Sequence, residues 1–261
     1  MYDLAALEAP LAGTVFAGKL HFSPVTGSTN TDALAAARSG APHGSVYFAD
    51  EQQAGRGRGD HAWQSAAGQG LYVSVLLRLS IEASVLPVIP LAAGLAAAEA
   101  IAITSSLNTD LRWPNDLLIG ERKAGGILVE SRSEGADVSF IVVGIGINVH
   151  QSEFDPDLAT PATSLDMEAG RRVSRGALLV SLLKSLECGT SGLHDPAVVA
   201  AIPARVAQFS TWLWNRLVEA HGPQACVGVT AGLDEHGFLR VRTKSGMVTV
   251  QTGGIRAAEI G

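Results

Sequence analysis

The sequence contains little of what several classes of protein require. Its 261 residues include only two cysteines, Cys188 and Cys226, and no CxxC pair, so neither a disulfide framework nor a zinc site is predicted. The seven histidines never stand at the spacing of metal ligands, and no residue is predicted to bind a metal directly. Lysine and arginine total 19 against 25 acidic residues, a formal charge of −6, which argues against a dedicated nucleic-acid-binding protein. The Gly-Lys-Ser/Thr ending of a P-loop is absent, so a nucleotide would be held in another way.

Sequence signals for membrane insertion and for export are weak as well. The longest apolar run, residues 86–103, is rich in alanine and contains two prolines, a glycine and Glu99, which favours a buried helix. The first ten residues carry two acids and no basic segment, so no signal peptide is predicted. With 47% hydrophobic residues, the chain is expected to be a globular cytoplasmic protein without a membrane partner.

Periodicity and turn residues predict a mixed α+β chain. Alternating or continuous apolar runs predict strands at 19–22, 46–49, 71–78, 111–114, 127–131 and 138–149. Helices are predicted at 91–103, 175–187 and 197–220, the last interrupted by Pro203, and an earlier one contains residues 34–38 and stops at Gly40. Thr29 and Asp32 form a predicted capping box, which places residues 27–30 at a helix N-terminus.

The pattern changes near Gly222. Short strands at 226–230, 238–243 and 248–251, joined by hairpin turns, predict a small β-barrel or β-sheet module. We therefore predict two domains, residues 1–221 and residues 222–261.

Residues 55–59, with the sequence GRGRG, alternate three glycines with two arginines. Glycine lets the backbone approach a ligand and expose its N–H groups, and arginine offers a planar charged fork suited to phosphate. The segment thus indicates phosphate binding, although a solvated loop or an RGG-like nucleic-acid segment has the same composition. Because such residues bury almost nothing and the two arginines repel each other, we expect the loop to need a bound anion to become ordered.

Three further places in the sequence carry polar groups near the ends of predicted strands. Residues 112–116, RWPND, present an amide and a carboxylate side by side, as does an ordinary turn that closes a strand. Lys123 stands before two glycines and an apolar strand, an unusual place for a solvated lysine, although a strand-edge lysine fits equally. Residues 144–148, GIGIN, lack the helix and third glycine of a dinucleotide-binding fold. Their glycines indicate close packing under a bound ligand, with Asn148 beside it; a plain strand with a polar end is the alternative.

The order of these motifs resembles that of the biotin–protein ligase family. The resemblance is spread over residues 27–149 and consists of GSTN, EQQAGRGRG, WPND, RKAGGILVE and GIGINV. The β-rich tail is similar to the small C-terminal SH3-like domain of that family. The resemblance implies an α+β fold: a mixed-sheet catalytic domain like that of class II synthetases, followed by a small SH3-like β-barrel.

The implied activity is an ATP-dependent ligation in two steps. Biotin and ATP, with Mg²⁺ as cofactor, would give biotinyl-5′-adenylate, and a lysine of a biotin carboxyl carrier domain would then take the biotinyl group. The sequence departs from the family in three places. The loop 55–60 reads GRGRGD where the family usually has GRGRRG, and Arg112 replaces the usual lysine of KWPND. Too few residues precede the first core strand for the DNA-binding domain that some members carry, so no DNA binding is expected; the oligomeric state is left open.

The resemblance also assigns roles to individual residues. The implied biotin-binding residues are Ser28, Thr29, Asn30, Gln52, Arg56, Gly57, Arg58 and Lys123. The implied nucleotide-binding residues are Arg58, Trp63, Asn115 and Asn148. The implied catalytic residues are Lys123, which would bind the biotin carboxyl oxygen and the α-phosphate, Arg58, and Asp116, which would orient or deprotonate the incoming amine.

Two other functions are compatible with the same residues. Lipoate–protein ligases share the fold and the acyl-adenylate chemistry, but they need a pocket for a linear dithiolane chain, and the motifs agree better with biotin. A non-enzymatic sensor of biotin or nucleotide, or an RNA-binding module, is the second alternative. The net charge disfavours RNA, and the presence of Lys123 and Asp116 disfavours an inactive sensor.

Overall fold

The computed structural model describes residues 2–59 and 61–258; Asp60, the acid of the GRGRGD loop, lies outside the described residues. A large sheet contains β1 (Leu20–Thr26), β2 (Ser45–Gln52), β3 (Gly70–Leu77), β4 (Asp110–Arg112), β5 (Asp116–Ile119), β6 (Arg122–Glu134) and β7 (Asp137–Asn148). A small sheet contains β8 (Trp214–His221), β9 (Cys226–Leu233), β10 (Leu239–Thr243), β11 (Gly246–Val250) and β12 (Gly254–Ala257). The helices are α1 (Leu4–Glu8), η1 (Ala9–Leu11), α2 (Thr29–Arg38), η2 (Ala83–Val88), α3 (Ile89–Ser105), α4 (Leu165–Ala169), α5 (Arg175–Thr190) and α6 (Pro196–Phe209).

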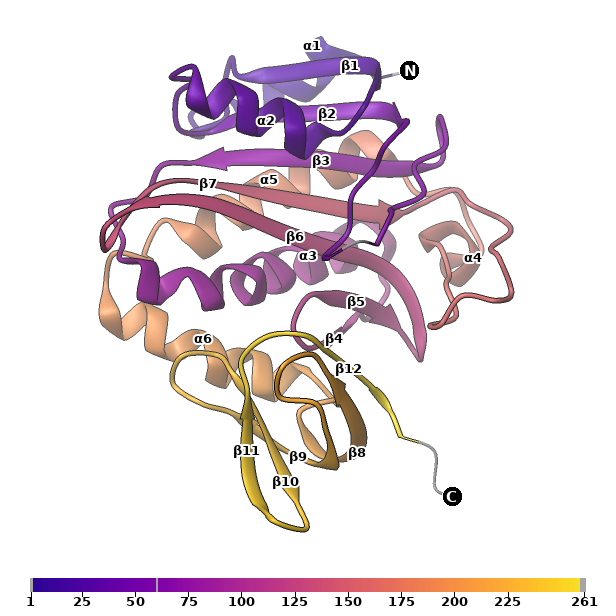
Figure 1. The fold of residues 1–261 in the computed structure, drawn as a ribbon. Coiled ribbons are helices and arrows are strands. Elements are labelled where there is room, and N and C mark those ends of the chain that lie inside the picture. The colour runs from indigo at the N-terminus through magenta and orange to yellow at the C-terminus, as the bar shows by residue number, and fades with distance from the viewer. Residues whose placement is uncertain (1, 60, 259–261) are drawn as a thin grey trace.

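The large sheet is mixed and has the strand order β1-β2-β3-β7-β6-β5-β4 (Figure 1). β1 and β2 pair in parallel, and every other neighbouring pair is antiparallel. β6 and β7 form a long hairpin whose turn carries Gly135 with a φ of 66°, a conformation that glycine adopts without strain. The mixed sheet, together with a second, antiparallel sheet, agrees with the predicted α+β class.

Helices cover both faces of the large sheet. On β3, Val73 and Val75 belong to the main core with α3 and α5, while Leu76 packs in a separate cluster with Ala33 and Ala37 of α2. Since alternate residues of a strand point to opposite faces, α2 covers one face of the sheet and α3 with α5 the other. This arrangement leaves the N-terminus of α2 beside the central strands.

The segment Ala83–Ser105, formed by η2 and α3, is long and apolar enough by length and composition to cross a membrane. However, 61% of its apolar part is buried inside the structure, where α3 packs against α5 and the large sheet. It is therefore the central core helix, as the sequence predicts for residues 86–103.

The small sheet begins earlier than the sequence predicts. A helix over 197–220 is wrong beyond residue 209, because α6 ends at Phe209 and β8 follows. Val218 and Ala220 of β8 are buried and Glu219 between them is exposed, which is the period of a strand and not of a helix. Pro203 does not interrupt α6, which continues through it. A domain boundary stays a prediction, and we propose to move it from 222 to about residue 210, before the first strand of this sheet.

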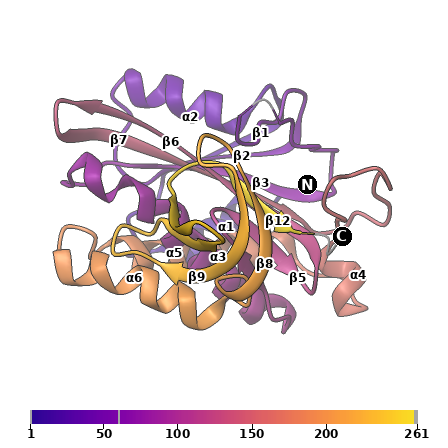
Figure 2. The ribbon, with the colours of Figure 1, turned by 60° about the horizontal axis from the view of Figure 1, so that its bottom comes forward.

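The small sheet stands over one end of the large sheet, and Figure 2 brings it to the front. Its strand order is β11-β10-β9-β8-β12. The indole Nε1 of Trp113, beyond β4, donates a hydrogen bond of 3.0 Å to the carbonyl of Gly237. Gly237 has a φ of 83° and lies so close to Leu91 of α3 that a Cβ there would be 2.8 Å from its side chain. These contacts fix the small sheet against the site described next.

Candidate active site

A cleft of about 1020 Å³ opens between the large sheet, its loops and the small sheet. All twelve residues predicted from the sequence line it: Ser28, Thr29, Asn30, Gln52, Arg56, Gly57, Arg58, Trp63, Asn115, Asp116, Lys123 and Asn148. They come from the N-terminus of α2, the glycine–arginine loop, the turn between β4 and β5, and the ends of β6 and β7. Segments separated by up to 120 residues thus meet at one place.

The N-terminus of α2 forms the polar end of the cleft. Ser28, Thr29 and Asn30 are only 4–5% exposed. The predicted capping box is wrong, because Ser28 is the N-cap residue and Asp32 accepts a hydrogen bond from Thr26 instead. The backbone N–H of Thr29 donates to Oε1 of Gln52 at 2.9 Å, so a side chain from β2 fixes this helix end. Within the described chain, the Ser28 side chain makes no capping bond to its helix, which leaves its hydroxyl for a ligand.

The glycine–arginine loop has bonds of its own. The N–H of Gly57 donates to the carbonyl of His61 at 2.7 Å, and Trp63 N–H to the carbonyl of Gly55 at 2.8 Å. Arg56 forms an ion pair with Glu130 of β6. Gly55 is buried and Gly57 and Arg58 are half-buried, so the expectation that the loop buries almost nothing is wrong for these three residues, while Arg56 and Gly59 are exposed as expected. Whether an anion orders the loop further stays a prediction.

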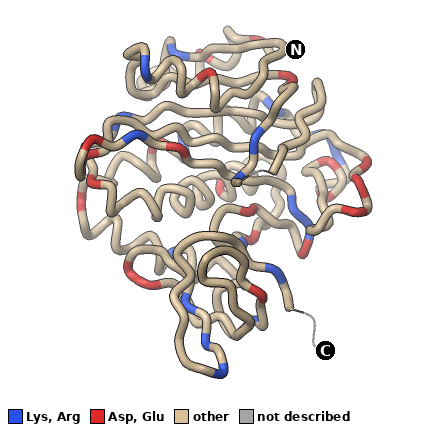
Figure 3. The backbone as a smooth tube through the Cα atoms, in the orientation of Figure 1, with Lys and Arg blue, Asp and Glu red and all other residues tan. Residues whose placement is uncertain are grey.

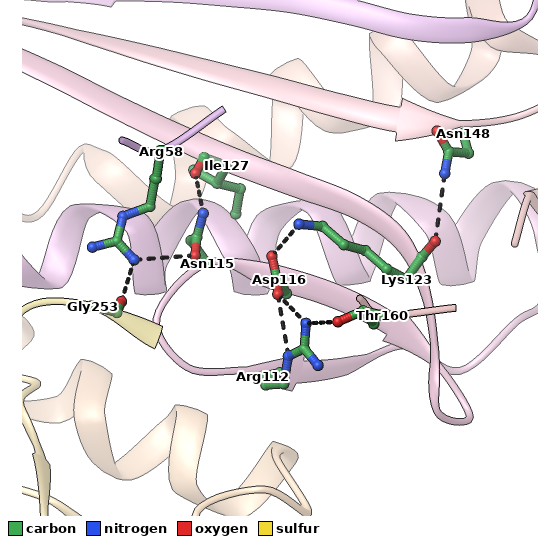
Figure 4. Close-up of polar contacts among 9 residues, drawn as sticks. All are labelled: Arg58, Arg112, Asn115, Asp116, Lys123, Ile127, Asn148, Thr160 and Gly253. Carbon is green, nitrogen blue, oxygen red and sulfur yellow. Dashed lines mark hydrogen bonds and ion pairs between the residues drawn. The ribbon is translucent and has the colours of Figure 1, made fainter. Parts of the chain in front are cut away.

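Arg58 joins the loop to both sheets (Figure 4). Its Nη1 donates to the carbonyl of Gly253 at 2.6 Å and lies 3.5 Å from Oδ1 of Asn115. Burial lowers the pKa of Arg58 below its ordinary value, and the negative charge of Asp116 opposes that shift. The guanidinium stays charged at neutral pH and places a cation over the middle of the cleft.

Asp116 lies between two cations (Figure 4). Its Oδ1 is 2.6 Å from Nζ of Lys123, and its Oδ2 accepts bonds from Nε (3.2 Å) and Nη2 (2.5 Å) of Arg112. Burial raises the pKa of Asp116, but Lys123 and Arg112 lower it by more, so that the pKa lies below its ordinary value. Arg112, the departure from the family's lysine, is 7% exposed and also donates to Thr160 at 3.0 Å. A lysine could not make these forked contacts.

The two amides predicted to bind the nucleotide, Asn115 and Asn148, have structural partners. Asn115 Nδ2 donates to the carbonyl of Ile127 at 2.7 Å. Asn148 Nδ2 lies 3.4 Å from the backbone carbonyl of Lys123 and 3.1 Å from that of Thr163, while its Oδ1 accepts from Gln151. Asn148 therefore positions the backbone of Lys123; its predicted contact with a nucleotide stays a prediction.

The glycines of GIGIN make room for side chains of the cleft. A Cβ on Gly144 would lie 2.0 Å from Oδ1 of Asn30, and one on Gly146 would lie 2.6 Å from Nε1 of Trp63. The Trp63 ring has Nζ of Lys123 5.5 Å from its centroid. The sequence predicts close packing of these glycines under a ligand. In the structure they pack against side chains of the protein itself, and both also line the cleft.

Several lining residues were missed from the sequence. They include Tyr72, several loop residues between 151 and 162, and His221, Gly222 and 253–256 in or beside the small sheet. The segment between β7 and α4 could have been found, since a loop of some fifteen residues without regular structure is often functional. The residues of the small sheet follow no pattern that points to a cleft more than 100 residues away.

The chain was compared with known proteins. Residues 22–148 match the model of the biotin/lipoate A/B protein ligase family. The biotin–[acetyl-CoA-carboxylase] ligase of Mycobacterium tuberculosis is 35% identical over 240 residues, which are 88% of this chain and 85% of that protein. The bifunctional ligase/repressor BirA of Bacillus subtilis is 31% identical over 246 residues, 90% of this chain and 73% of that protein.

Solved structures agree with these relatives. The biotin protein ligase of Aquifex aeolicus in complex with biotin and ATP superposes with a TM-score of 0.78 at 27% identity, covering 92% of this chain and 98% of that one. The match includes the mixed sheet and the second sheet, which confirms the predicted fold class. The predicted family and class of enzyme are confirmed as well. The chain belongs to the biotin protein ligase family.

Proposed function

We propose that this protein activates biotin with ATP as biotinyl-5′-adenylate and transfers the biotinyl group to a lysine of a biotin carboxyl carrier domain. The observation that supports this most is the cleft itself, which unites a polar pocket at the start of α2 with the cations Arg58 and Lys123. Relatives named as biotin–[acetyl-CoA-carboxylase] ligases support the carrier domain as the acceptor.

The first step joins two anions, and it needs positive charge between them. The biotin carboxylate attacks the α-phosphorus of ATP, a bond to oxygen forms, and pyrophosphate leaves with the electron pair of the broken P–O bond. Lys123 stands where it can exchange Asp116 for the carboxylate and phosphate oxygens, since its side chain is 28% exposed and faces the cleft. Arg58 adds a second fixed cation. Such preorganised charges stabilise the charge that develops on phosphate.

In the second step, the ε-amine of the acceptor lysine attacks the acyl carbon of the adenylate. An amide forms, the bond between the acyl carbon and the phosphate oxygen breaks so that AMP leaves with its electron pair, and the amine gives up its proton to the solvent or to the departing phosphate. When Lys123 moves onto the substrate, Oδ1 of Asp116 becomes free while Arg112 still holds Oδ2. Arg112 still lowers the pKa of Asp116 in that arrangement, so Asp116 suits the orientation of an amine N–H better than the removal of a proton.

Magnesium stays a prediction. Among the described residues no group of three or more histidine, cysteine, aspartate or glutamate side chains is arranged to hold a metal ion. Asp116, the carboxylate beside Lys123, is already paired with two cations. The residues present therefore do not fit a resident magnesium site, and we assign no step to the protein's own metal ligands.

The cytoplasmic location and the absence of DNA binding also stay predictions. Figure 3 shows acidic and basic residues interspersed over the large sheet and its helices, in keeping with the net charge of −6.

Biotin-dependent exchange of pyrophosphate into ATP tests the proposed function. We expect exchange with biotin and little with lipoate, followed by labelling of a carrier domain when one is added. Exchange that prefers lipoate would establish the lipoate ligase alternative. Binding of biotin without exchange would establish a sensor.

We expect Arg58→Ala to release the adenylate prematurely. Arg58 connects the glycine–arginine loop to Gly253, so its removal opens the cleft at the loop and removes a charge that holds the phosphate. The measurement is biotinylation of a bystander protein in the absence of acceptor, which should increase severalfold over wild type. Arg240→Ala, on the exposed side of β10, is the matched control and should change nothing. Equal bystander labelling by Arg58→Ala and wild type would exclude this role.

A further inference from the structure

A row of buried polar groups crosses the large sheet beneath the cleft. Ser74 of β3 pairs with Gly144 of β7, and Gly144 pairs with Leu128 of β6. Because Gly144 has no side chain, Asn30 of α2 occupies the space above it. Oδ1 of Asn30 accepts a hydrogen bond from Ser74 at 2.5 Å, and its Nδ2 donates to Oε2 of Glu130 at 2.9 Å. Ser74 is fully buried and Asn30 is 4% exposed.

The orientation of the Asn30 amide follows from its neighbours. An ionised carboxylate can only accept hydrogen bonds, and so can a backbone carbonyl. Nδ2 faces both, Glu130 at 2.9 Å and the carbonyl of Leu128 at 3.4 Å. Arg56 forms an ion pair with the same Glu130 oxygen. Oδ1 must therefore be the end that faces Ser74.

The hydroxyl hydrogens are then fixed in turn. Ser74 has one hydrogen, which it donates to Asn30. The contact of 2.7 Å between Ser74 Oγ and Thr29 Oγ1 must consequently use the hydrogen of Thr29. The hydrogen of Thr29 thus lies between two acceptors of the protein, Oγ of Ser74 and Oε1 of Gln52, 3.1 Å away, and the latter oxygen also accepts from the backbone N–H of Thr29. Thr29 lines the cleft, and toward a ligand its Oγ1 can offer only lone pairs.

We propose that Ser74 and Glu130 are specificity-determining positioning residues that fix the Thr29 hydroxyl as a hydrogen-bond acceptor. The pocket then selects a ligand with an N–H group at this place and rejects one with an oxygen there. The inference rests on the proposed function, in which the ligand is biotin, whose ureido ring carries two N–H groups.

The test uses biotin and the two cyclic-carbamate analogues in which one or the other ring N–H is replaced by oxygen. Wild-type protein should bind the analogue that places oxygen against Thr29 at least about tenfold more weakly than biotin, because two acceptors then face each other. In Ser74→Ala the Thr29 hydroxyl keeps only Oε1 of Gln52, 3.1 Å away, as an acceptor within the protein and can turn to donate to the oxygen of the analogue, so this ratio should fall below about threefold. The ratio of the dissociation constants for the other analogue and biotin should not change. A general disturbance of the pocket could not produce an effect confined to one analogue.

Variants of Glu130 provide a second route to the same answer. Glu130→Gln keeps an oxygen that Arg56 holds toward Asn30. The ratios of the dissociation constants of the two analogues to that of biotin should therefore stay within twofold of the wild-type values. Glu130→Ala removes the carboxylate acceptor of Asn30 but leaves the Leu128 carbonyl. The ratio of the dissociation constants for the analogue with oxygen against Thr29 and for biotin should therefore fall, but by less than in Ser74→Ala. Dissociation constants from calorimetry give all the ratios.

The outcomes separate the two proposals. Ratios in Ser74→Ala and Glu130→Ala equal to those of wild type for both analogues would overturn the role of this row of residues, and Glu130→Ala decides the matter if Ser74→Ala does not fold. Wild-type protein that neither binds biotin nor exchanges pyrophosphate with it would instead overturn the proposed function, and the assignment of the ring N–H with it.

Discussion

Lys123→Ala is expected to lower biotin-dependent ATP–pyrophosphate exchange by about 10²–10³-fold, the usual cost of removing one preorganised charge from a developing oxyanion. The amine of Lys123 lies in the cleft, 2.6 Å from Asp116 and 5.5 Å from the centroid of the Trp63 ring. No other lysine lines the cleft among the described residues. Arg58 is held by Gly253 and Asn115 and cannot replace it without breaking those bonds.

Lys123→Ala should affect the two steps of the reaction unequally, which makes the prediction specific. Transfer from chemically prepared biotinyl-5′-adenylate should suffer less than exchange, because the two anions have already been joined. Lys123→Arg should recover only part of the exchange, since a guanidinium keeps the charge but not the shape. Lys184→Ala, on the exposed side of α5, is the control and should behave as wild type. Exchange by Lys123→Ala within twofold of wild type would contradict the role assigned to this lysine.

The site residues that could be predicted are those that lie in short contiguous motifs. Glycine–arginine alternation and the Asn115–Asp116 pair can be recognised without knowing where the chain folds. Their residues all reach one cleft because each motif stands at a strand or helix end on the same side of the sheet.

The remaining features depend on register, which the sequence alone does not specify. Ser74 looks like any small residue in a buried strand until β3 is aligned with β7, and only then does it face Asn30 over Gly144. Arg112 could be seen as a charge, but its two bonds to Asp116 require the turn between β4 and β5. The sequence favours a helix over β8 because this segment follows a long alanine- and valine-rich run. It is a strand because it pairs with β9, which lies further along the chain.

Asp116→Asn is the second change expected to have a large effect. The substitution keeps the shape of the side chain but removes the negative charge between Lys123 and Arg112. Loss of one partner of a buried ion pair costs about 3–5 kcal/mol, and we expect about 2–3 kcal/mol here because Lys123 is partly exposed. Exposed Asp137→Asn is the control and should change the free energy of unfolding by less than about 0.5 kcal/mol.

The effect of Asp116→Asn should depend on pH in a direction that the structure fixes. Burial alone would raise the pKa of Asp116, yet the two cations lower it below the value of about 3.9 that it has in an unfolded chain. A group whose pKa is lower in the folded state stabilises the fold fully above the unfolded pKa. As the pH falls from there through the folded pKa, the unfolded chain binds the proton first and the stabilisation is lost.

The free energy of unfolding should therefore differ between wild type and Asp116→Asn by the full amount at pH 7, and the difference should shrink steadily below about pH 4. Urea titrations at pH 7, 4 and 3 measure it, with Asp137→Asn following wild type throughout. A difference that stays constant over this range would mean that the carboxylate of Asp116 is not held ionised by Lys123 and Arg112.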